Sequence, residues 1–196
     1  MPDSVVFVGF TGRHAEAAVV RERQEASEDA VMTRIGQAVM LLHGGDREEA
    51  RNRFGELWTE LGEAGDAFHR CALAHYMADT QDDPGDELAW DLRALTAADG
   101  LGEESAAGDR GDDGGAGGDR WATAREDVPG TSSVVRAFYP SLHLNLAADY
   151  LKLQRPEAAR LHLDRARDAA DALGDEGDVN GVRAGIDRLE RQLRER

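Results

Sequence analysis

Three side chains capable of chemistry recur at four-residue intervals in the middle of the chain: Cys71, His75 and Asp79. In a helix this spacing places them on one face, so a thiolate, an imidazole and a carboxylate would stand in line. Such a set could bind zinc or form a nucleophile–base pair. A zinc site needs further ligands, and no second cysteine or histidine cluster occurs at a recognisable spacing. We therefore predict no metal site, no cofactor and no catalytic residue, and a protein that is not an enzyme.

Composition narrows the classes of partner. The 196 residues carry 23 basic and 39 acidic side chains, for a formal net charge of −16. An acidic surface repels phosphate backbones and anionic lipids, so we expect neither nucleic acid nor a membrane as a partner. The favoured partner is another protein or peptide with a basic patch. Lys152 is the single lysine among the basic residues, which is typical of high-GC bacterial coding.

The cysteine count and the N-terminal residues predict a cytoplasmic location. A single cysteine excludes an internal disulfide and fits a reducing compartment. The apolar run from Val5 to Phe10 is too short to span a bilayer, and it has neither a basic segment before it nor a cleavage site after it. We therefore expect neither a membrane anchor nor an export signal.

Hydrophobic periodicity predicts an all-α chain. Apolar residues recur every three or four positions from about residue 15 to residue 100, and again from about residue 132 to residue 193. Glycines and capping residues divide these stretches into helices. These dividing residues are Gly44 and Gly45, Asp46 with Glu49, Asp66, Asp83 with Pro84, Pro156 and Gly174.

The same pattern divides the chain into five segments. They are a poorly defined lead-in (1–13), two helical hairpins (14–100), an insertion rich in glycine and aspartate (101–130), a third hairpin (131–174) and a C-terminal capping helix (175–196). The insertion has almost no apolar content to offset the entropy cost of ordering, so we predict that it is flexible. Whether it is regulatory, and whether the lead-in is ordered, stay open.

The three hairpins share one spacing of small and large apolar residues. The third reads Leu146–Ala147–x2–Tyr150 in its first helix and Ala159–x3–Leu163 in its second. The first reads Gln37–Ala38–x2–Leu41 and Ala50–x3–Phe54. The second reads Leu73–Ala74–x2–Met77, with Leu88 and Leu92 at the two positions of the partner helix. Ala38 and Ala74 are 36 residues apart.

This series resembles the tetratricopeptide repeat, a helix-turn-helix unit with a 34-residue period. The chain departs from the motif at its tryptophan position, which holds Arg34, Arg70 and His143, and it lacks the closing proline. Units of this family cannot bury their apolar faces alone, so they stack. The resemblance implies a short tetratricopeptide-like α-solenoid of three helical hairpins plus the C-terminal capping helix.

The resemblance also implies a site. In this family the first helix of each pair lines a concave groove that receives a peptide or a partner helix. The groove positions carried onto this chain are Cys71, His75 and Asp79 in the second hairpin, and Leu144, Asn145, Ala148 and Lys152 in the third. One continuous groove requires that Asn145 face the same cleft as His75. The Asn145 amide can either hold a peptide backbone or bond a neighbouring helix.

The implied function is a non-enzymatic adaptor or scaffold that binds a peptide or helix of another protein. An alternative stays open, in which the domain is regulatory or a sensor and its groove binds a small molecule or a signalling peptide. The sequence does not identify the partner, the pathway or the oligomeric state.

Overall fold

The computed structural model describes residues 30–108, 133–174 and 180–195. Within these ranges every regular element is an α-helix, and no described residue lies in a strand, so the all-α prediction is confirmed. The lead-in at residues 1–13 and the stretch 109–130 of the insertion lie outside the described residues.

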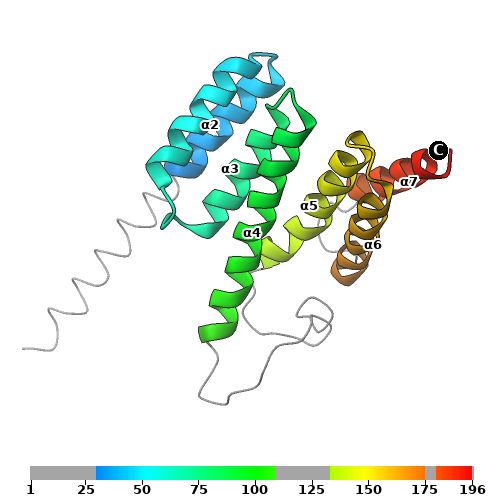
Figure 1. Cartoon of the computed structure of the whole chain (residues 1–196). Coiled ribbons are helices and arrows are strands. Elements are labelled where there is room, and N and C mark those ends of the chain that lie inside the picture. Colours follow the sequence, from blue (N-terminus) through cyan, green and yellow to red (C-terminus); the bar gives the residue numbers. More distant parts are fainter. Residues whose placement is uncertain (1–29, 109–132, 175–179, 196) are drawn as a thin grey trace, which may run out of the picture.

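The helices follow one another in chain order. After a first helix described over residues 30–43 come α2 (Arg47–Leu61), α3 (Ala67–Asp79), α4 (Pro84–Gly108), α5 (Ser133–Lys152), α6 (Pro156–Leu173) and α7 (Asn180–Arg194). Each of α2 to α7 packs against the next along the chain, and α5 also contacts α7. Figure 1 shows the result, a row of helices laid side by side rather than a bundle around one centre.

Two of the three predicted aspartate caps form. Asp66 Oδ1 accepts a hydrogen bond from the backbone N–H of His69 at 2.9 Å. Asp83 Oδ1 accepts from the N–H groups of Gly85 and Asp86 at 2.8 and 3.1 Å. The capping box predicted for Asp46 is wrong, because its side chain caps nothing. Its intended partner, the Glu49 carboxylate, is held instead by Arg53 at 2.8 Å.

The fourth helix is longer than the periodicity predicts. It continues to Gly108, past Gly100, where the sequence pattern fades. Ala94 and Ala98 are fully buried against Leu142 of α5, which anchors this part of the helix. The residues beyond are mostly alanine, leucine and glutamate, whose helix propensity offsets the cost of the glycines, about 1 kcal/mol each.

Three apolar clusters join the helices in overlapping sets of three. The first cluster joins the first helix, α2 and α3 around Phe54, and the second joins α3, α4 and α5 around Leu142. The third joins α5, α6 and α7 around Leu163. Because α3 and α5 each belong to two clusters, they are the helices that connect the row.

Helices α2, α4 and α6 turn the same positions toward the core. The eighth residue of each, counted from its first residue, is buried: Phe54, Asp91 and Leu163. The sequence register proposed for α4 is therefore wrong. Leu92, assigned to the large apolar position, is 39% exposed, and Asp91, which is 1% exposed, takes that place. The turn before α4 has four residues, 80–83, whereas the turns before α2 and α6 have three, 44–46 and 153–155. The assignment of Leu92 allows two extra residues in this turn, but the structure has only one, so the buried position falls one residue earlier, at Asp91.

Candidate functional site

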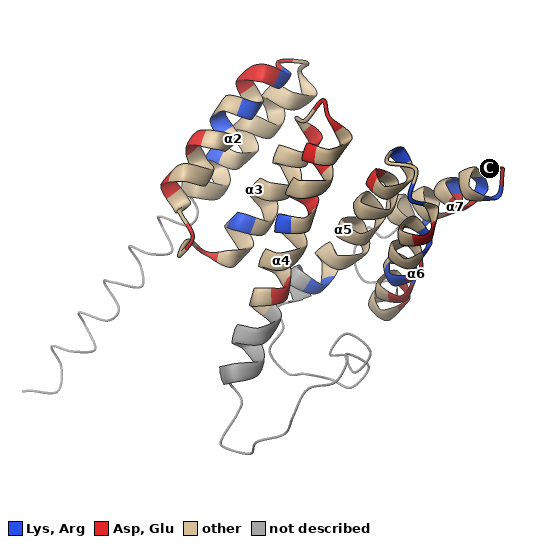
Figure 2. Cartoon of the chain, in the orientation of Figure 1, with Lys and Arg blue, Asp and Glu red and all other residues tan. Residues whose placement is uncertain are grey.

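A group of polar side chains converges where α3, α4 and α5 meet, and we call it the polar junction. Its members are His75 and Asp79 on α3, Glu87 and Asp91 on α4, and Asn145, Asp149 and Lys152 on α5. Within each helix the members lie three or four residues apart, so each helix presents them on one face. Figure 2 shows acidic residues gathered at the α3–α4 turn and the first turn of α4, next to this junction.

Asn145 and His75 connect α5 directly to α3. Asn145 Nδ2 lies 3.2 Å from His75 Nδ1, so the two residues that were predicted to face one cleft are in contact with each other. In this arrangement the amide bonds a neighbouring helix, which is one of the two roles that the sequence left open. If the imidazole carries a second proton, its Nδ1 becomes a donor, and the Asn145 amide must then turn its oxygen toward the ring.

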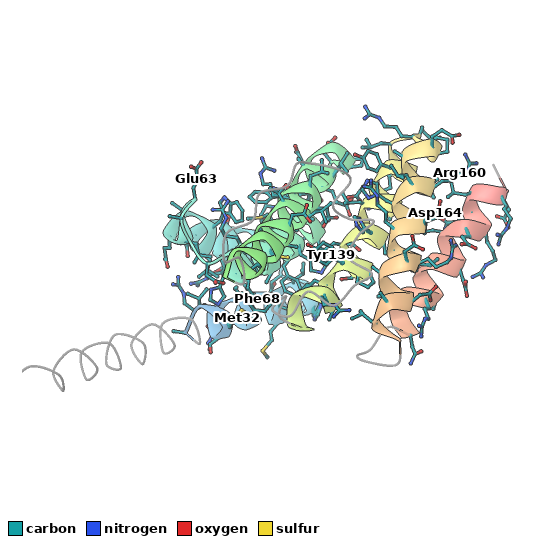
Figure 3. All side chains as sticks on the ribbon, turned by 90° about the horizontal axis from the view of Figure 1, so that it is seen from below. Met32, Glu63, Phe68, Tyr139, Arg160 and Asp164 are labelled. Carbon is teal, nitrogen blue, oxygen red and sulfur yellow. The ribbon has the colours of Figure 1, made fainter. Side chains whose placement is uncertain are left out.

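A second α3–α5 contact lies further down the same helices. The ring of Phe68 meets that of Phe138 edge to face, with centroids 5.7 Å apart. Next to it the Tyr139 hydroxyl donates to Asp99 Oδ1 of α4 at 3.0 Å. Figure 3 labels Phe68 and Tyr139, seen from below. Phe68 and Phe138, like His75 and Asn145, are 70 residues apart, so α3 and α5 run parallel in one register.

Lys152 joins α5 to α4. Its ammonium nitrogen lies 2.5 Å from Glu87 Oε1 and 3.2 Å from Asp149 Oδ1. The Lys152 side chain is 46% exposed, whereas that of Asp149 is 1% exposed, so this contact runs from solvent into the interior. Pairing with Glu87 is the natural role for a lysine beside buried acid groups, because its flexible stem lets the charge reach water.

Two buried carboxyls lie at the centre of the junction. Asp91 and Asp149 are each 1% exposed. Asp91 Oδ1 and Asp149 Oδ2 are buried without a hydrogen-bond partner among the described residues. Burial, followed by the charges of Asp91 and Glu87 and a hydrogen bond with Asp91, raises the pKa of Asp149 to about 8 against the opposing effect of Lys152. Asp149 is therefore a neutral acid at pH 7.

The pKa of His75 is shifted in the direction expected for a side chain next to these acids. Its Nδ1 lies 3.9 Å from Asp91 Oδ1. Burial alone would lower the pKa of His75, but the interactions with Asp91 and the charge of Asp79 outweigh it, so the pKa is raised above its ordinary value. The interactions with Asp91 and Asp79 thus favour the protonated form of the imidazole.

The remaining predicted site residues lie elsewhere. Cys71 is 2% exposed and packs into the second apolar cluster. Burial, followed by the charges of Asp91 and Asp99, raises the pKa of its thiol to about 12, so it is neither a thiolate nor accessible. Leu144 and Ala148 pack toward α7 in the third cluster, where Leu144 lies against Gly185. The structure therefore brings together His75, Asp79, Asn145 and Lys152 of the predicted set.

A second polar contact lies between α5 and α6. His143 Nδ1 and His162 Nδ1 are 3.1 Å apart, and Tyr150 stacks on His162 with centroids 5.3 Å apart. Burial lowers the pKa of each histidine to about 4; the charge of His162 adds to this for His143, and that of Arg165 for both. Both rings are therefore neutral at pH 7, with one Nδ1 donating to the other, which is a structural contact.

No group of three or more histidine, cysteine, aspartate or glutamate side chains among the described residues is placed to hold a metal ion. The four acids and the histidine of the polar junction do not form such a group either. Lys152 contacts Glu87 and Asp149, and His75 lies 3.9 Å from Asp91. Its chemistry is that of protons and charge pairs.

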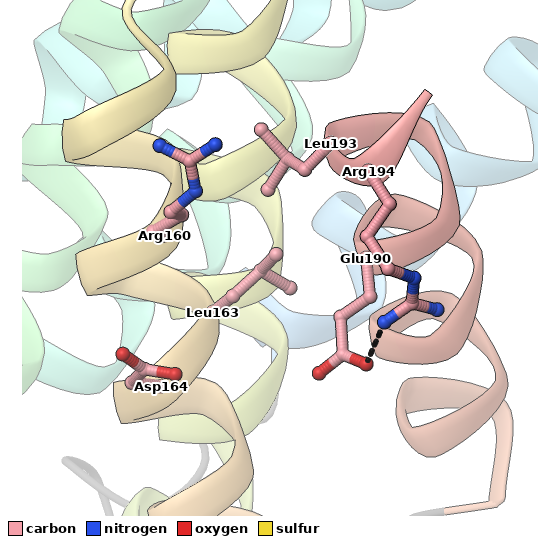
Figure 4. A pocket seen from close by; sticks show the side chains of 6 residues that line it. All are labelled: Arg160, Leu163, Asp164, Glu190, Leu193 and Arg194. Atoms are coloured by element: carbon pink, nitrogen blue, oxygen red, sulfur yellow. Dashed lines mark hydrogen bonds and ion pairs between the residues drawn. The ribbon is translucent and has the colours of Figure 1, made fainter. Parts of the chain in front are cut away.

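The described cavities lie at the two ends of the row. A cavity of about 530 Å³ between α6 and α7 is lined by Arg160, Leu163, Asp164, Glu190, Leu193 and Arg194 (Figure 4). Its charged residues are already paired, as Glu190 is with Arg194 at 3.5 Å. Another, of about 570 Å³, lies on the first helix and α2. Neither adjoins the polar junction, and neither concentrates groups that could act on a ligand.

Three residues of the junction were not predicted from the sequence: Glu87, Asp91 and Asp149. A signal for Asp91 is present in the chain, because an aspartate stands at the helix position that holds phenylalanine in α2 and leucine in α6. Asp149 has no comparable signal, since an acid next to an apolar stripe is normally on a solvated face.

Among the described helices none is both long enough and apolar enough to cross a membrane. Comparison with protein-family models, with curated proteins and with solved structures finds no match to this chain.

Proposed function

We propose that the protein is a non-enzymatic adaptor that binds a basic peptide or helix of another protein along the face formed by α3 and α5. The observation that carries the proposal is the parallel pairing of these two helices. The contacts Phe68–Phe138 and His75–Asn145 are separated by seven residues on each helix, so α3 and α5 lie side by side over about two turns. Two parallel helices in contact offer a continuous surface to one ligand.

Stacking of tetratricopeptide-like hairpins accounts for this pairing. In such a solenoid the first helices of successive hairpins line one face, while the second helices cover the other. The overlapping three-helix clusters and the shared buried positions of α2, α4 and α6 support this arrangement. On this reading α3 and α5 are first helices of the second and third hairpins, and α7 is the capping helix.

The charge of the face favours a cationic partner. Asp79 is exposed at the end of α3, and Asp82, Asp83 and Asp86 are exposed in the adjoining turn and first turn of α4. Lys152 is the cation of the junction opposite them, and Glu87 and Asp149 already engage it. A basic peptide is therefore attracted to this end of the face and guided along it.

A non-enzymatic role fits the chemistry of the same region. The Cys71 thiol is buried and protonated, and the buried carboxyl oxygens of Asp91 and Asp149 have no measurable contact with solvent. A catalytic group has to touch its substrate, and these groups cannot do so.

Selection from a displayed peptide library tests the proposal, with the full chain as bait. The informative variant is Asp79→Lys, because Asp79 is exposed and the substitution reverses a charge on the face. The matched control is Asp168→Lys, which makes the same change at an exposed position of α6. We expect enrichment of peptides rich in lysine and arginine on the wild-type chain. Asp79→Lys should weaken their binding about tenfold, corresponding to 1.4 kcal/mol, and Asp168→Lys should not.

Two results would contradict the proposal. The first is that the selection yields no peptide that binds more than a chain-free control does, while the mass spectrum of the native protein shows a stoichiometric small molecule. That combination would favour the sensor alternative. The other is equal loss of binding in the two variants, which would mean that overall charge rather than the α3–α5 face is recognised.

A further inference from the structure

We propose that the polar junction is a proton-operated joint: a single proton shared by the Asp91 and Asp149 carboxyls holds α5 against α4, and loss of that proton loosens the docking of α5, α6 and α7 on the rest of the row. The proposal is independent of any partner, because it concerns contacts within the chain.

The first step is the position of Asp91. It stands where α2 has Phe54 and α6 has Leu163, at a position of its helix that is 1% exposed. An apolar residue there would pack α4 against its neighbours without electrostatic cost. Placing an ionisable group in such a position costs several kcal/mol unless the charge is compensated. The packing of α4 therefore depends on the protonation and charge of the groups around Asp91.

The second step is that the two carboxyls need a proton between them. Asp91 and Asp149 are both buried, and each has one oxygen with no hydrogen-bond partner among the described residues. Two carboxylates at close quarters repel, whereas a protonated carboxyl donates to an ionised one. One proton thus converts a repulsion across the α4–α5 contact into a hydrogen bond.

The third step is the balance of charge around the pair. The groups that face it are His75 and Asp79 from α3, Glu87 from α4, and Lys152 from α5, with the neutral Cys71 thiol next to Asp91. With the shared proton in place and His75 charged, two cations face three anions. Without both protons, Lys152 alone faces four anions, which are Asp79, Glu87, Asp91 and Asp149.

The direction of the pH dependence follows from these states. The pKa of Asp149 is raised to about 8 in the folded chain, so its contribution to stability is fully present below its ordinary pKa near 4 and is lost as pH rises toward 8. The pKa of His75 is also raised, so its contribution is likewise lost as pH rises through the folded value. Both groups act in the same sense, and the joint is tightest in mild acid.

Urea unfolding of the full chain between pH 6 and pH 9 tests the proposal. Between pH 6 and pH 8 the folded chain holds one proton that the unfolded chain releases. The unfolding equilibrium constant should therefore rise about 100-fold over this range, with little further change by pH 9. Asp149→Asn keeps the shape of the side chain and can still form hydrogen bonds, but it cannot ionise. The rise in its unfolding equilibrium constant from pH 6 to pH 8 should therefore be smaller than that of the wild type by about tenfold or more. The control Asp168→Asn, at an exposed site on α6, should keep the wild-type profile.

Amide hydrogen exchange locates the effect. Between pH 7 and pH 9, exchange in α5 should accelerate beyond the chemical dependence of the rate on pH, and exchange in α2 should not. This excess should be absent in Asp149→Asn. If the excess is instead uniform over α2 and α5, the joint is not where the chain opens and the proposal is overturned.

A measurement on the unmodified chain covers the case in which Asp149→Asn does not fold. The side-chain carboxyl carbons of Asp91 and Asp149, followed by NMR, should show that one of the two carboxyls keeps its proton at pH 6. Complete ionisation of both below pH 5 would overturn the proposal. So would a wild-type stability that is flat from pH 6 to pH 9, or variants Asp149→Asn and Asp168→Asn with the same pH profile.

Discussion

Mild acid should weaken the contact between α5 and α6 through the paired imidazoles of His143 and His162. Their Nδ1 atoms are 3.1 Å apart, and the pKa of each is lowered from 6.5 to about 4. Because the pKa is lower in the folded chain, the unfolded chain takes up protons first as the pH falls. The contribution of each neutral imidazole to the free energy of unfolding is therefore fully present above pH 6.5 and is lost as pH falls toward 4. At pH 5 the loss is about 2 kcal/mol per histidine, or about 4 kcal/mol for the pair.

A loss of that size is a large share of the 5–15 kcal/mol that stabilises a typical domain. Urea denaturation followed by circular dichroism at pH 7 and pH 5 measures it. The double variant His143→Gln/His162→Gln should lose about 4 kcal/mol less than the wild type over this interval. His43→Gln, at an exposed position of the first helix, serves as the control and should match the wild type. His75, which acts in the opposite sense, is present in all three chains and cancels in the comparison.

Equal pH dependence in the wild type and the double variant would refute the reasoning. NMR titration of the two imidazoles in the wild-type chain gives a check that does not depend on the folding of the variant. Both rings should stay neutral at pH 6, and a pKa near 6.5 for either would show that the contact does not exclude the proton.

Three further predictions concern the packing of the row. Asp66→Ala should cost about 1 kcal/mol in urea unfolding because it removes a formed cap, whereas Asp46→Ala should cost only a few tenths because that side chain caps nothing; equal costs would contradict the cap assignment. Cys71 should resist a thiol reagent at pH 8 in the native chain and react fully in urea, and rapid stoichiometric labelling without urea would contradict its burial. Arg51→Ala should cost about 1–2 kcal/mol, because Arg51 bonds Thr80 O and Asp82 at the end of α3, while the exposed Arg53→Ala should stay within about 0.5 kcal/mol; a larger loss for Arg53→Ala would reverse the argument.

The helices were predictable where local chemistry decides them. Apolar spacing and the caps at Asp66 and Asp83 predict the elements, because those side chains satisfy backbone groups close to them in sequence. The prediction failed at the register of α4, where the repeat spacing assigns the large apolar position to Leu92. The buried residue there is Asp91, and its burial depends on partners on α3 and α5 that lie far away in sequence.

The candidate site was predictable in part for the same reason. The repeat spacing predicts that His75 and Asn145 line one groove. The structure brings the two side chains into contact, and neither described cavity adjoins them. The four-residue spacing of Cys71, His75 and Asp79 correctly placed them on one side of α3, yet Cys71 is buried. Helix α3 packs against α2 and α4 and contacts α5 through Phe68 and His75. Seven of its thirteen residues are buried, and periodicity alone cannot separate these from residues that face a groove.

The most direct test of the adaptor proposal is to map a selected basic peptide onto the chain by NMR. At saturation, the account predicts that the largest backbone amide shifts fall on α3 and α5, including His75, Asp79 and Asn145, and that Asp79→Lys raises the peptide concentration needed to reach them about tenfold. Shifts confined to the cavity between α6 and α7, near Arg160 and Leu193, would contradict it.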